Sequence, residues 1–285
     1  MHGGYVTTLI KAMTLSIITI NYNNRDGLQK TIDSVLAQTW KDYEWIVIDG
    51  GSTDGSRELI EQYQEHFAYW CSEPDKGVYH AMNKGIAKAK GDYVNFMNSG
   101  DAYYDNQVLK RVFVEENIED VVYGDWMEMY KDKMEIMSIS QEQLFSKLWF
   151  QNICHQAMFI KTRILKEKGY DEAMKFLADW VRNTEMVLSG KCFKRIPIII
   201  CKYDMYGISS QRDLTVLKEE IGTVRNLYPK PLLVALQELY NYRCNKYVQQ
   251  TLYLTNGNRV SVSLTKCVLI TLSFISRIFS KKRSL

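Results

Sequence analysis

Hydrophobic residues in the first hundred positions form short continuous runs that alternate with helically spaced apolar positions. The continuous runs predict buried β-strands at residues 15–20, 44–48, 69–72 and 93–97. The helical spacing predicts helices at residues 25–38, 56–67 and 78–90. This alternation is typical of an α/β fold with a mostly parallel sheet and helices on both faces.

The pattern changes after residue 120. Strand-like stretches, broken by helices such as 176–189, are predicted at residues 121–130, 133–139, 157–160 and 192–201. No linker rich in Pro, Gly or Ser separates the two halves. We therefore expect one domain over residues 13–235, made of a parallel-sheet half (13–120) and an α+β half (121–235), and then a C-terminal helical tail (236–285).

Polar loops follow three of the predicted strands, at residues 21–24, 49–55 and 98–101. The carboxyl ends of parallel strands share one edge of the sheet, where α/β folds bind ligands. One such loop can simply turn a strand into a helix. Reversing the chain does not require carboxylates and amides in all three loops. We therefore predict a ligand-binding crevice at this edge of the sheet.

Composition limits the classes of partner. The chain is 46% hydrophobic and 24% charged, with a net charge of 36 − 33 = +3, so neither disorder nor a nucleic-acid partner is indicated. Six cysteines lie far apart without a C-x-x-C pair, which is typical of free thiols in a reducing compartment. The first residues lack an apolar run of signal-peptide length. These features predict a cytoplasmic protein.

Basic residues concentrate at the C-terminus. Residues 259–285 hold six Lys or Arg and no Asp or Glu, which leaves the preceding residues at −3. One face of this segment is apolar, but Lys266 and Arg277 interrupt it, so it is unsuited to span a bilayer. It predicts either an interfacial helix on the inner leaflet of the cytoplasmic membrane or a helix packed on the protein's own core.

Four segments carry a family resemblance. Residues 16–23 (SIITINYN), 49–55 (DGGSTDG) and 98–101 (NSGD) resemble the nucleotide-sugar motifs of inverting family-2 glycosyltransferases. Residues 73–85 resemble a subgroup that builds bacterial surface polysaccharides of the capsule or O-antigen type. The resemblance implies a Rossmann-like GT-A fold. It also implies a nucleoside-diphosphate sugar as the donor, linked to UDP, and a lipid-linked glycan as the acceptor.

The same resemblance places the donor site on these segments. Tyr22 is expected either to stack on the nucleobase or to anchor a half-buried loop, and Asp49 to accept an N–H of a uracil-type base. The further donor-binding residues implied are Thr19, Asn23, Gly50, Ser52, Asp54, Lys84, Ser99 and Gly100.

A departing nucleoside diphosphate needs a divalent cation or fixed donors to stabilise its negative charge. The resemblance implies Mg²⁺ or Mn²⁺ held by Asp101. The family's usual pair of carboxylates is here Ser99-Gly100-Asp101. One carboxylate of the pair is therefore absent, which leaves open whether the metal is obligatory.

An inverting transfer also needs a base for the acceptor hydroxyl. Asp179 matches the family's acidic base, although an Asp at this position also suits a helix cap. Asp125 is the next candidate. His155 and Gln156 are expected with Asp125 on the acceptor side, and residues 207–210 suggest a loop over the donor.

Two other functions fit part of the pattern. A nucleotidyltransferase shares the α/β layout but carries a Gly-rich triphosphate loop after its first strand, which residues 21–25 lack. The missing carboxylate leaves room for a non-catalytic nucleotide-sugar-binding or assembly protein. Turnover of a nucleotide sugar separates an enzyme from such a protein.

Overall fold

The computed structural model describes residues 14–113, 119–205 and 214–244. The predicted donor loop at 207–210 and the basic segment at 259–285 lie outside these residues. The chain divides into two compact units, Met1–Tyr228 and Pro229–Leu285. In the second unit the described part is one helix, α9 (Lys230–Cys244). Within the described ranges, no helix combines the length and apolar character needed to cross a membrane.

The first half contains every strand and helix that the hydrophobic pattern predicts. In chain order its elements are β1 (Leu15–Asn21), α1 (Arg25–Leu36), β2 (Tyr43–Asp49), α2 (Ser56–Gln62), η1 (Gln64–His66), β3 (Tyr69–Ser72), α3 (Val78–Lys88), β4 (Tyr93–Phe96), β5 (Ala102–Tyr103) and α4 (Val108–Phe113). The helix predicted over 56–67 is thus an α-helix followed by a 3₁₀ turn.

The second half mixes strands with short helices, as predicted. Its elements are β6 (Val121–Met129), β7 (Met134–Met137), η2 (Gln141–Gln143), α5 (Leu144–Lys147), η3 (His155–Ala157), β8 (Met158–Lys161), α6 (Thr162–Glu167), α7 (Ala178–Leu188), β9 (Phe193–Asp204) and α8 (Leu214–Asn226).

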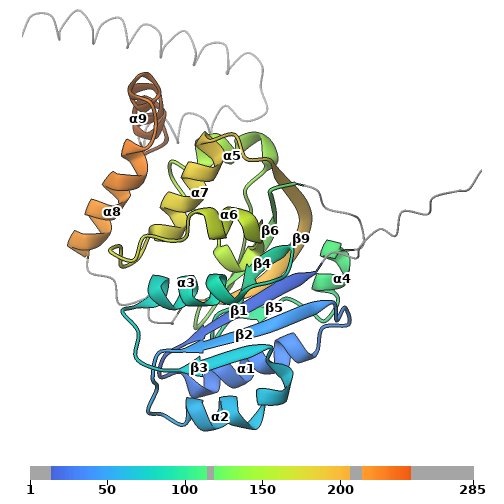
Figure 1. Cartoon of the computed structure of the whole chain (residues 1–285). Helices are drawn as coiled ribbons and strands as arrows, with labels where there is room; N and C mark the ends of the chain where they lie inside the picture. The colour runs from blue at the N-terminus through green and yellow to red at the C-terminus, as the bar shows by residue number, and fades with distance from the viewer. Residues whose placement is uncertain (1–13, 114–118, 206–213, 245–285) are drawn as a thin grey trace, which may run out of the picture. The chain divides into compact units, whose positions relative to one another are not determined.

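All nine described strands belong to one sheet, in the order β3-β2-β1-β4-β8-β6-β9-β5, with β7 paired to β6 (Figure 1). Strands β3, β2, β1 and β4 run parallel. Strand β8 is antiparallel to both β4 and β6, and β6 and β9 are parallel to each other. The parallel half therefore continues directly into a mixed half, and one curled sheet carries both.

The register of the parallel strands aligns their carboxyl ends. Asn21 at the end of β1 lies opposite Asp49 at the end of β2, and Asp49 lies opposite Ser72 at the end of β3. Beyond β4, the N–H of Ser99 donates to the carbonyl of Ile20, which continues the pairing with β1. The loops after these strands therefore start from one edge of the sheet.

Helices cover the two faces of the parallel half. Helix α1 buries the face formed by Leu28, Ile32 and Val35, whereas α3 packs on β1 and β2 from the other side (Figure 1). Helix α3 approaches the sheet closely at Gly85, where an added Cβ would overlap Cγ2 of the buried Ile18. A residue without a side chain is needed there.

We predict that Gly85→Ala destabilises the protein by about 1–3 kcal/mol, because the added methyl group overpacks the interface between α3 and β1. Urea unfolding measures the change. The matched control is Gly222→Ala in α8, where an added Cβ meets no atom within 4 Å. Helix propensity alone stabilises that variant by about 0.5–1 kcal/mol. Equal stabilities of the two variants would contradict this packing.

Candidate active site

A cleft of about 550 Å³ opens at the aligned strand ends. Its walls come from the loops after β1, β2, β3 and β4, from the start of α3, and from the end of β9. Of the predicted site residues, five line it: Tyr22, Gly50, Ser99, Asp101 and Gln156. The Tyr22 side chain is 51% exposed, so an aromatic face is available to a ligand.

Asp49 lies beneath the cleft and shapes the loop after β2. The residue is wholly buried. Its Oδ1 accepts hydrogen bonds from the Asn21 amide (2.7 Å) and the Ser52 hydroxyl (2.5 Å), and its Oδ2 from the Ser72 hydroxyl (2.7 Å). The N–H groups of Gly51 and Ser52 also donate to Oδ2. These five donors compensate the burial of the carboxylate, and a contact of Asp49 with a nucleobase stays a prediction.

Asn23 and Asp54 tie the first two loops together. Asn23 has φ 46° in the left-handed region, its N–H donates to the Ser52 hydroxyl (2.8 Å), and its Oδ1 accepts from the N–H of Thr53 (2.8 Å). Asp54 accepts from the first N–H of α1, at Arg25, and from that of α2, at Ser56. Partial burial raises the pKa of Asp54, but these hydrogen bonds outweigh it and lower the pKa overall.

Three further predicted donor residues do not line the cleft. Thr19 is buried within the sheet, donates to the carbonyl of Met97 (2.8 Å) and accepts from the Trp45 indole (3.0 Å). Lys84 forms an ion pair with Glu73 (2.5 Å). Gly100 has φ +102°, and its N–H donates to the Thr31 hydroxyl. This residue therefore shapes the backbone of the loop after β4.

Asp101 combines burial with access to the cleft. It is 4% exposed; its Oδ1 accepts from the N–H of Asp204 (2.9 Å) and its Oδ2 from the amide of Gln156 (2.5 Å). Burial raises the pKa of Asp101 to about 7, although these two hydrogen bonds oppose the rise. Asp204, at the end of β9, also lines the cleft.

Asp179 lies on the first turn of α7, at the centre of a polar cluster. Its Oδ1 accepts from the Tyr79 hydroxyl (3.1 Å), and its Oδ2 from the Asn152 amide (2.8 Å). The same Oδ2 lies 3.2 Å from Nδ1 of His155. Burial and the neighbouring Asp179 charge raise the pKa of Tyr79 well above its ordinary value, so this phenol remains protonated and serves as a donor.

The segment that leads into α7 is held from another element. Leu177, its N-cap residue, offers no side-chain cap. The buried Glu220 of α8 instead accepts from the N–H groups of Lys175 (2.6 Å), Phe176 (3.0 Å) and Leu177 (2.8 Å). Glu220 thus holds the backbone that leads into α7, on which Asp179 is the second residue.

Asp125, on β6, is held by Arg195. One guanidinium nitrogen donates to both carboxylate oxygens, at 2.7 and 2.8 Å. Asp125 lines neither this cleft nor the second pocket described below. Its placement on the acceptor side with His155 and Gln156 stays a prediction.

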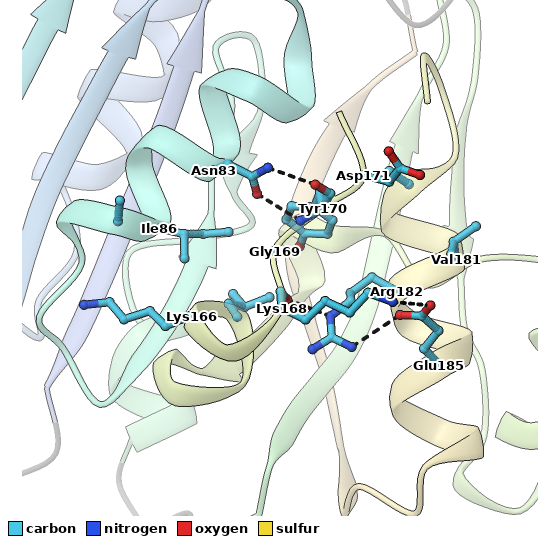
Figure 2. A pocket seen from close by; sticks show the side chains of 13 residues that line it. Asn83, Ile86, Lys166, Lys168, Gly169, Tyr170, Asp171, Val181, Arg182 and Glu185 are labelled. Carbon is cyan, nitrogen blue, oxygen red and sulfur yellow. Dashed lines mark hydrogen bonds and ion pairs between the residues drawn. The ribbon is translucent and has the colours of Figure 1, made fainter. Parts of the chain in front are cut away.

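A second pocket, of about 530 Å³, lies among α3, α6 and α7 (Figure 2). Its lining includes Ile86, Leu165 and Val181, and Arg182 and Glu185 pair at its edge. Asn83 spans one side, where its amide bonds the backbone N–H and carbonyl of Tyr170. None of the predicted site residues lines this pocket.

Several lining or contacting residues escaped the sequence interpretation. The cleft includes Asp75, Tyr203 and Asp204, and the Asp179 cluster includes Tyr79 and Asn152. Asp204 ends the long apolar strand β9, so the strand-end rule applied to the first half was also a signal for it. Asn152 carries no local signal, because only the fold brings it to Asp179.

A curled sheet flanked by helices, with a polar cleft at the ends of its parallel strands, is the arrangement of the GT-A fold. The sequence model of glycosyl transferase family 2 matches residues 16–183. The chain belongs to this family and is a transferase.

Proteins of similar sequence are also named as glycosyltransferases. An uncharacterized glycosyltransferase of Mycobacterium tuberculosis is 32% identical over 232 residues, 78% of this chain and 87% of the relative. A PGL/p-HBAD biosynthesis glycosyltransferase of the same species is 30% identical over 217 residues, 74% of this chain and 81% of the relative. A putative teichuronic acid biosynthesis glycosyltransferase of Bacillus subtilis is 36% identical over 103 residues, 34% and 40% of the two chains.

Solved structures share the fold. Staphylococcus aureus TarS 1–349 in complex with UDP-GlcNAc superposes with a TM-score of 0.62 at 15% identity, covering 87% of this chain and 77% of that one. A mannosyltransferase of Pyrobaculum calidifontis in complex with GDP-Man and Mn²⁺ has a TM-score of 0.60 at 17% identity, covering 94% and 83%. The predicted GT-A fold is confirmed.

We predict that the buried Asp101 lowers the free energy of unfolding in a pH-dependent way. Because its pKa is about 7 in the folded chain and roughly 4 when unfolded, only the folded chain keeps the proton between these values. Stability therefore falls as pH rises through this interval and levels off above it. Across this pH interval, the free energy of unfolding of Asp101→Asn should rise by about 2–4 kcal/mol relative to that of wild type.

Chemical unfolding in metal-free buffer at several pH values measures this difference. Asp26→Asn is the control for loss of one carboxylate, since the Asp26 side chain is 98% exposed. Parallel stability curves for wild type and Asp101→Asn would contradict the assignment.

Proposed function

We propose that this protein is an inverting glycosyltransferase that moves a sugar from a UDP-linked donor to a hydroxyl of a growing, lipid-linked cell-surface glycan. The observation that carries the proposal is the cleft at the aligned strand ends, with an exposed aromatic ring at Tyr22 and a carboxylate at Asp101. The relatives described as acting in PGL/p-HBAD and teichuronic acid biosynthesis support a cell-surface product.

The cleft offers complementary chemistry for the donor. A nucleobase has an aromatic face and a polar edge. An added Cβ at Gly50 would come within 2.7 Å of the Asp75 carboxylate and 3.0 Å of the Tyr22 ring, so Gly50 leaves a narrow space between these two side chains. We assign the base to Tyr22 and Asp75, and the diphosphate to the neighbourhood of Ser99 and Asp101.

Asp101 and Asp204 fit a divalent cation. Mg²⁺ and Mn²⁺ prefer hard oxygen ligands and commonly bind one or two carboxylates together with phosphate oxygens. Burial is the main cause of the raised pKa of Asp101, and the charge of Asp204 adds to it. A bound cation would relieve the repulsion between the two carboxylates. Oxygens of the donor diphosphate and water would supply the other ligands of such an ion. When bound, the ion would stabilise the charge of the departing diphosphate.

The chain's own residues supply the remaining steps. Ser99 and the exposed Tyr22 bind the donor, and the second half of the domain contributes the group that removes the acceptor proton. We assign this base to Asp179, because its carboxylate lies on the first turn of α7 in the second half and beside His155, whose neighbour Gln156 lines the cleft.

Incubation with UDP- and GDP-sugars tests the function. A glycosyltransferase slowly hydrolyses its donor even without an acceptor, and released diphosphate is measured. Binding of a donor without any turnover would indicate a nucleotide-sugar-binding protein instead.

Asp101→Ala should abolish transfer and remove stimulation by Mn²⁺ or Mg²⁺, because it takes away the carboxylate that we assign to the metal. Donor turnover with and without added metal measures both effects. Asp105→Ala is the control: this nearby carboxylate pairs with Arg111 and does not line the cleft. Full activity of Asp101→Ala, or an unchanged wild-type rate in excess EDTA, would rule out the metal assignment.

Asp179→Asn should keep the fold and donor binding but lower turnover by about 10²–10⁴, the usual cost of losing a general base. The amide preserves the shape of the carboxylate and lacks its charge. Turnover and donor affinity are measured together. A loss below about tenfold with intact affinity would move the base elsewhere, and Asp125 is then the next residue to substitute.

We also propose that the protein acts in the cytoplasm at the inner face of the membrane, held by residues 259–285. Truncation after Asn258 should release it from anionic liposomes and leave donor hydrolysis largely intact. The Debye length falls from about 10 Å at 0.1 M salt to about 3 Å at 1 M, so binding must weaken with salt. Sedimentation at both salt concentrations measures it, and salt-independent binding or binding unaffected by truncation would exclude the anchor.

A further inference from the structure

We propose that Gln156 is a positioning residue for the divalent cation. It holds the Asp101 carboxylate in the orientation that binds the ion, and the Cys154 thiol fixes which end of the Gln156 amide faces Asp101. The inference rests on the proposed function, which assigns the cation to Asp101 and Asp204, and it names a residue that sets the affinity for that ion. Gln156 and Asp101 both line the donor cleft.

The hydrogen bonds of Asp101 orient its carboxylate and leave room for a cation. Oδ1 accepts from the N–H of Asp204 (2.9 Å), and Oδ2 accepts from the amide of Gln156 (2.5 Å). The terminal torsion of an Asp side chain is otherwise broad, so one donor on each oxygen fixes it. An ionised carboxylate has about four acceptor positions on its two oxygens. Each oxygen of Asp101 therefore keeps a lone pair for a metal ion.

Gln156 is the side-chain partner of the two. It is 1% exposed, whereas the N–H of Asp204 belongs to the main chain and is kept when side chains are substituted. Since residues 99 and 100 are Ser and Gly, the loop after β4 offers no second carboxylate next to Asp101. Cation binding then depends strongly on the direction of one carboxylate, and hydrogen-bond partners of a metal-binding carboxylate set that direction.

The Cys154 thiol determines the orientation of the Gln156 amide. Only the nitrogen end of the amide can donate to the Asp101 carboxylate, because the oxygen end would place two acceptors together. The Cys154 thiol donates to Oε1 of Gln156 (2.9 Å). This contact directs the amide oxygen toward Cys154 and the amide nitrogen toward Asp101.

The backbone of η3, which carries Gln156, is fastened to β4. Asn95 on β4 is wholly buried, and its amide donates to the carbonyl oxygens of Gln156 (3.0 Å) and Met158 (2.8 Å). Its Oδ1 accepts from the Tyr103 hydroxyl (2.8 Å). The Gln156 side chain therefore starts from a fixed point beside the strand that leads to Asp101.

Mn²⁺ binding to the full-length protein tests the inference without turnover. The electron paramagnetic resonance signal of the free ion falls as the ion binds, so a titration in the presence of UDP gives the Kd, after correction for Mn²⁺ bound by UDP alone. Gln156→Met keeps the length of the side chain and removes its donor. The Kd of this variant for Mn²⁺ should be about 10–100-fold above that of wild type.

Gln38→Met is the matched control. Gln38 is also 1% exposed, and its amide likewise bonds at both ends, because it donates to the carbonyl of Asp105 (2.8 Å) and accepts from the N–H of Leu109 (3.2 Å). It does not line the cleft. Thermal unfolding measures the stability that each variant loses. The Kd of Gln38→Met for Mn²⁺ should equal that of wild type whatever its loss of stability.

Substitution of Cys154 tests the same arrangement with Gln156 in place, and it serves if Gln156→Met does not fold. Cys154→Ala removes the donor to Oε1 and should raise the Kd for Mn²⁺, by less than Gln156→Met does, because a thiol is a weak donor. Cys154→Ser keeps a donor at this position and should restore an affinity near that of wild type. Equal affinities of these two variants would overturn the role of the thiol.

The outcomes separate this inference from the proposed function. An unchanged or lower Kd in Gln156→Met, with wild type binding Mn²⁺, would overturn the positioning role and leave the function standing. A raised Kd in Gln38→Met equal to that in Gln156→Met would show a general effect of lost stability and would also overturn it. Absence of Mn²⁺ binding by wild type in the presence of UDP would overturn the metal assignment itself, and the positioning role with it.

Discussion

The site depends on one buried carboxylate. Asp49 ends β2 in register with Asn21 on one side and Ser72 on the other, and it accepts hydrogen bonds from both of these side chains. An ionised group in the interior is tolerated only when such donors compensate its lost hydration. The requirement fixes the loop after β2 against the ends of β1 and β3, and the floor of the cleft is the result.

A second constraint joins the two halves of the domain. The 3₁₀ turn η3 lies just before β8, the antiparallel strand that connects the parallel half to the mixed half. Through His155 and Gln156 it contacts Asp179 on α7 and Asp101 after β4. One short segment therefore links the two carboxylates to which we assign the metal and the acceptor proton, and a displacement at a single carbon needs both groups close together.

The sequence predicted the parallel half well, because its information is local. Apolar runs and helical spacing define the elements, and the parallel topology then requires the strand-end loops to meet. Tyr22, Gly50, Ser99 and Asp101 lie in loops that this rule predicted to meet, and all four line the cleft. Gln156, which the family resemblance placed on the acceptor side, lines it as well.

Partnerships between distant residues were not predictable in the same way. Asp125 and Asp179 look alike as isolated carboxylates, yet one is paired with Arg195 and the other is surrounded by Tyr79, Asn152 and His155. These partners lie between 24 and 100 residues away. Sheet order and helix packing decide which partners surround each carboxylate. No local sequence pattern contains this information.

We propose that this cleft cleaves a nucleotide sugar with inversion at the anomeric carbon. Real-time proton NMR of donor hydrolysis tests it most directly, because the configuration of the released sugar is read before mutarotation. From an α-linked UDP-sugar, the account predicts the β anomer as the first product. Initial release of the α anomer would contradict it.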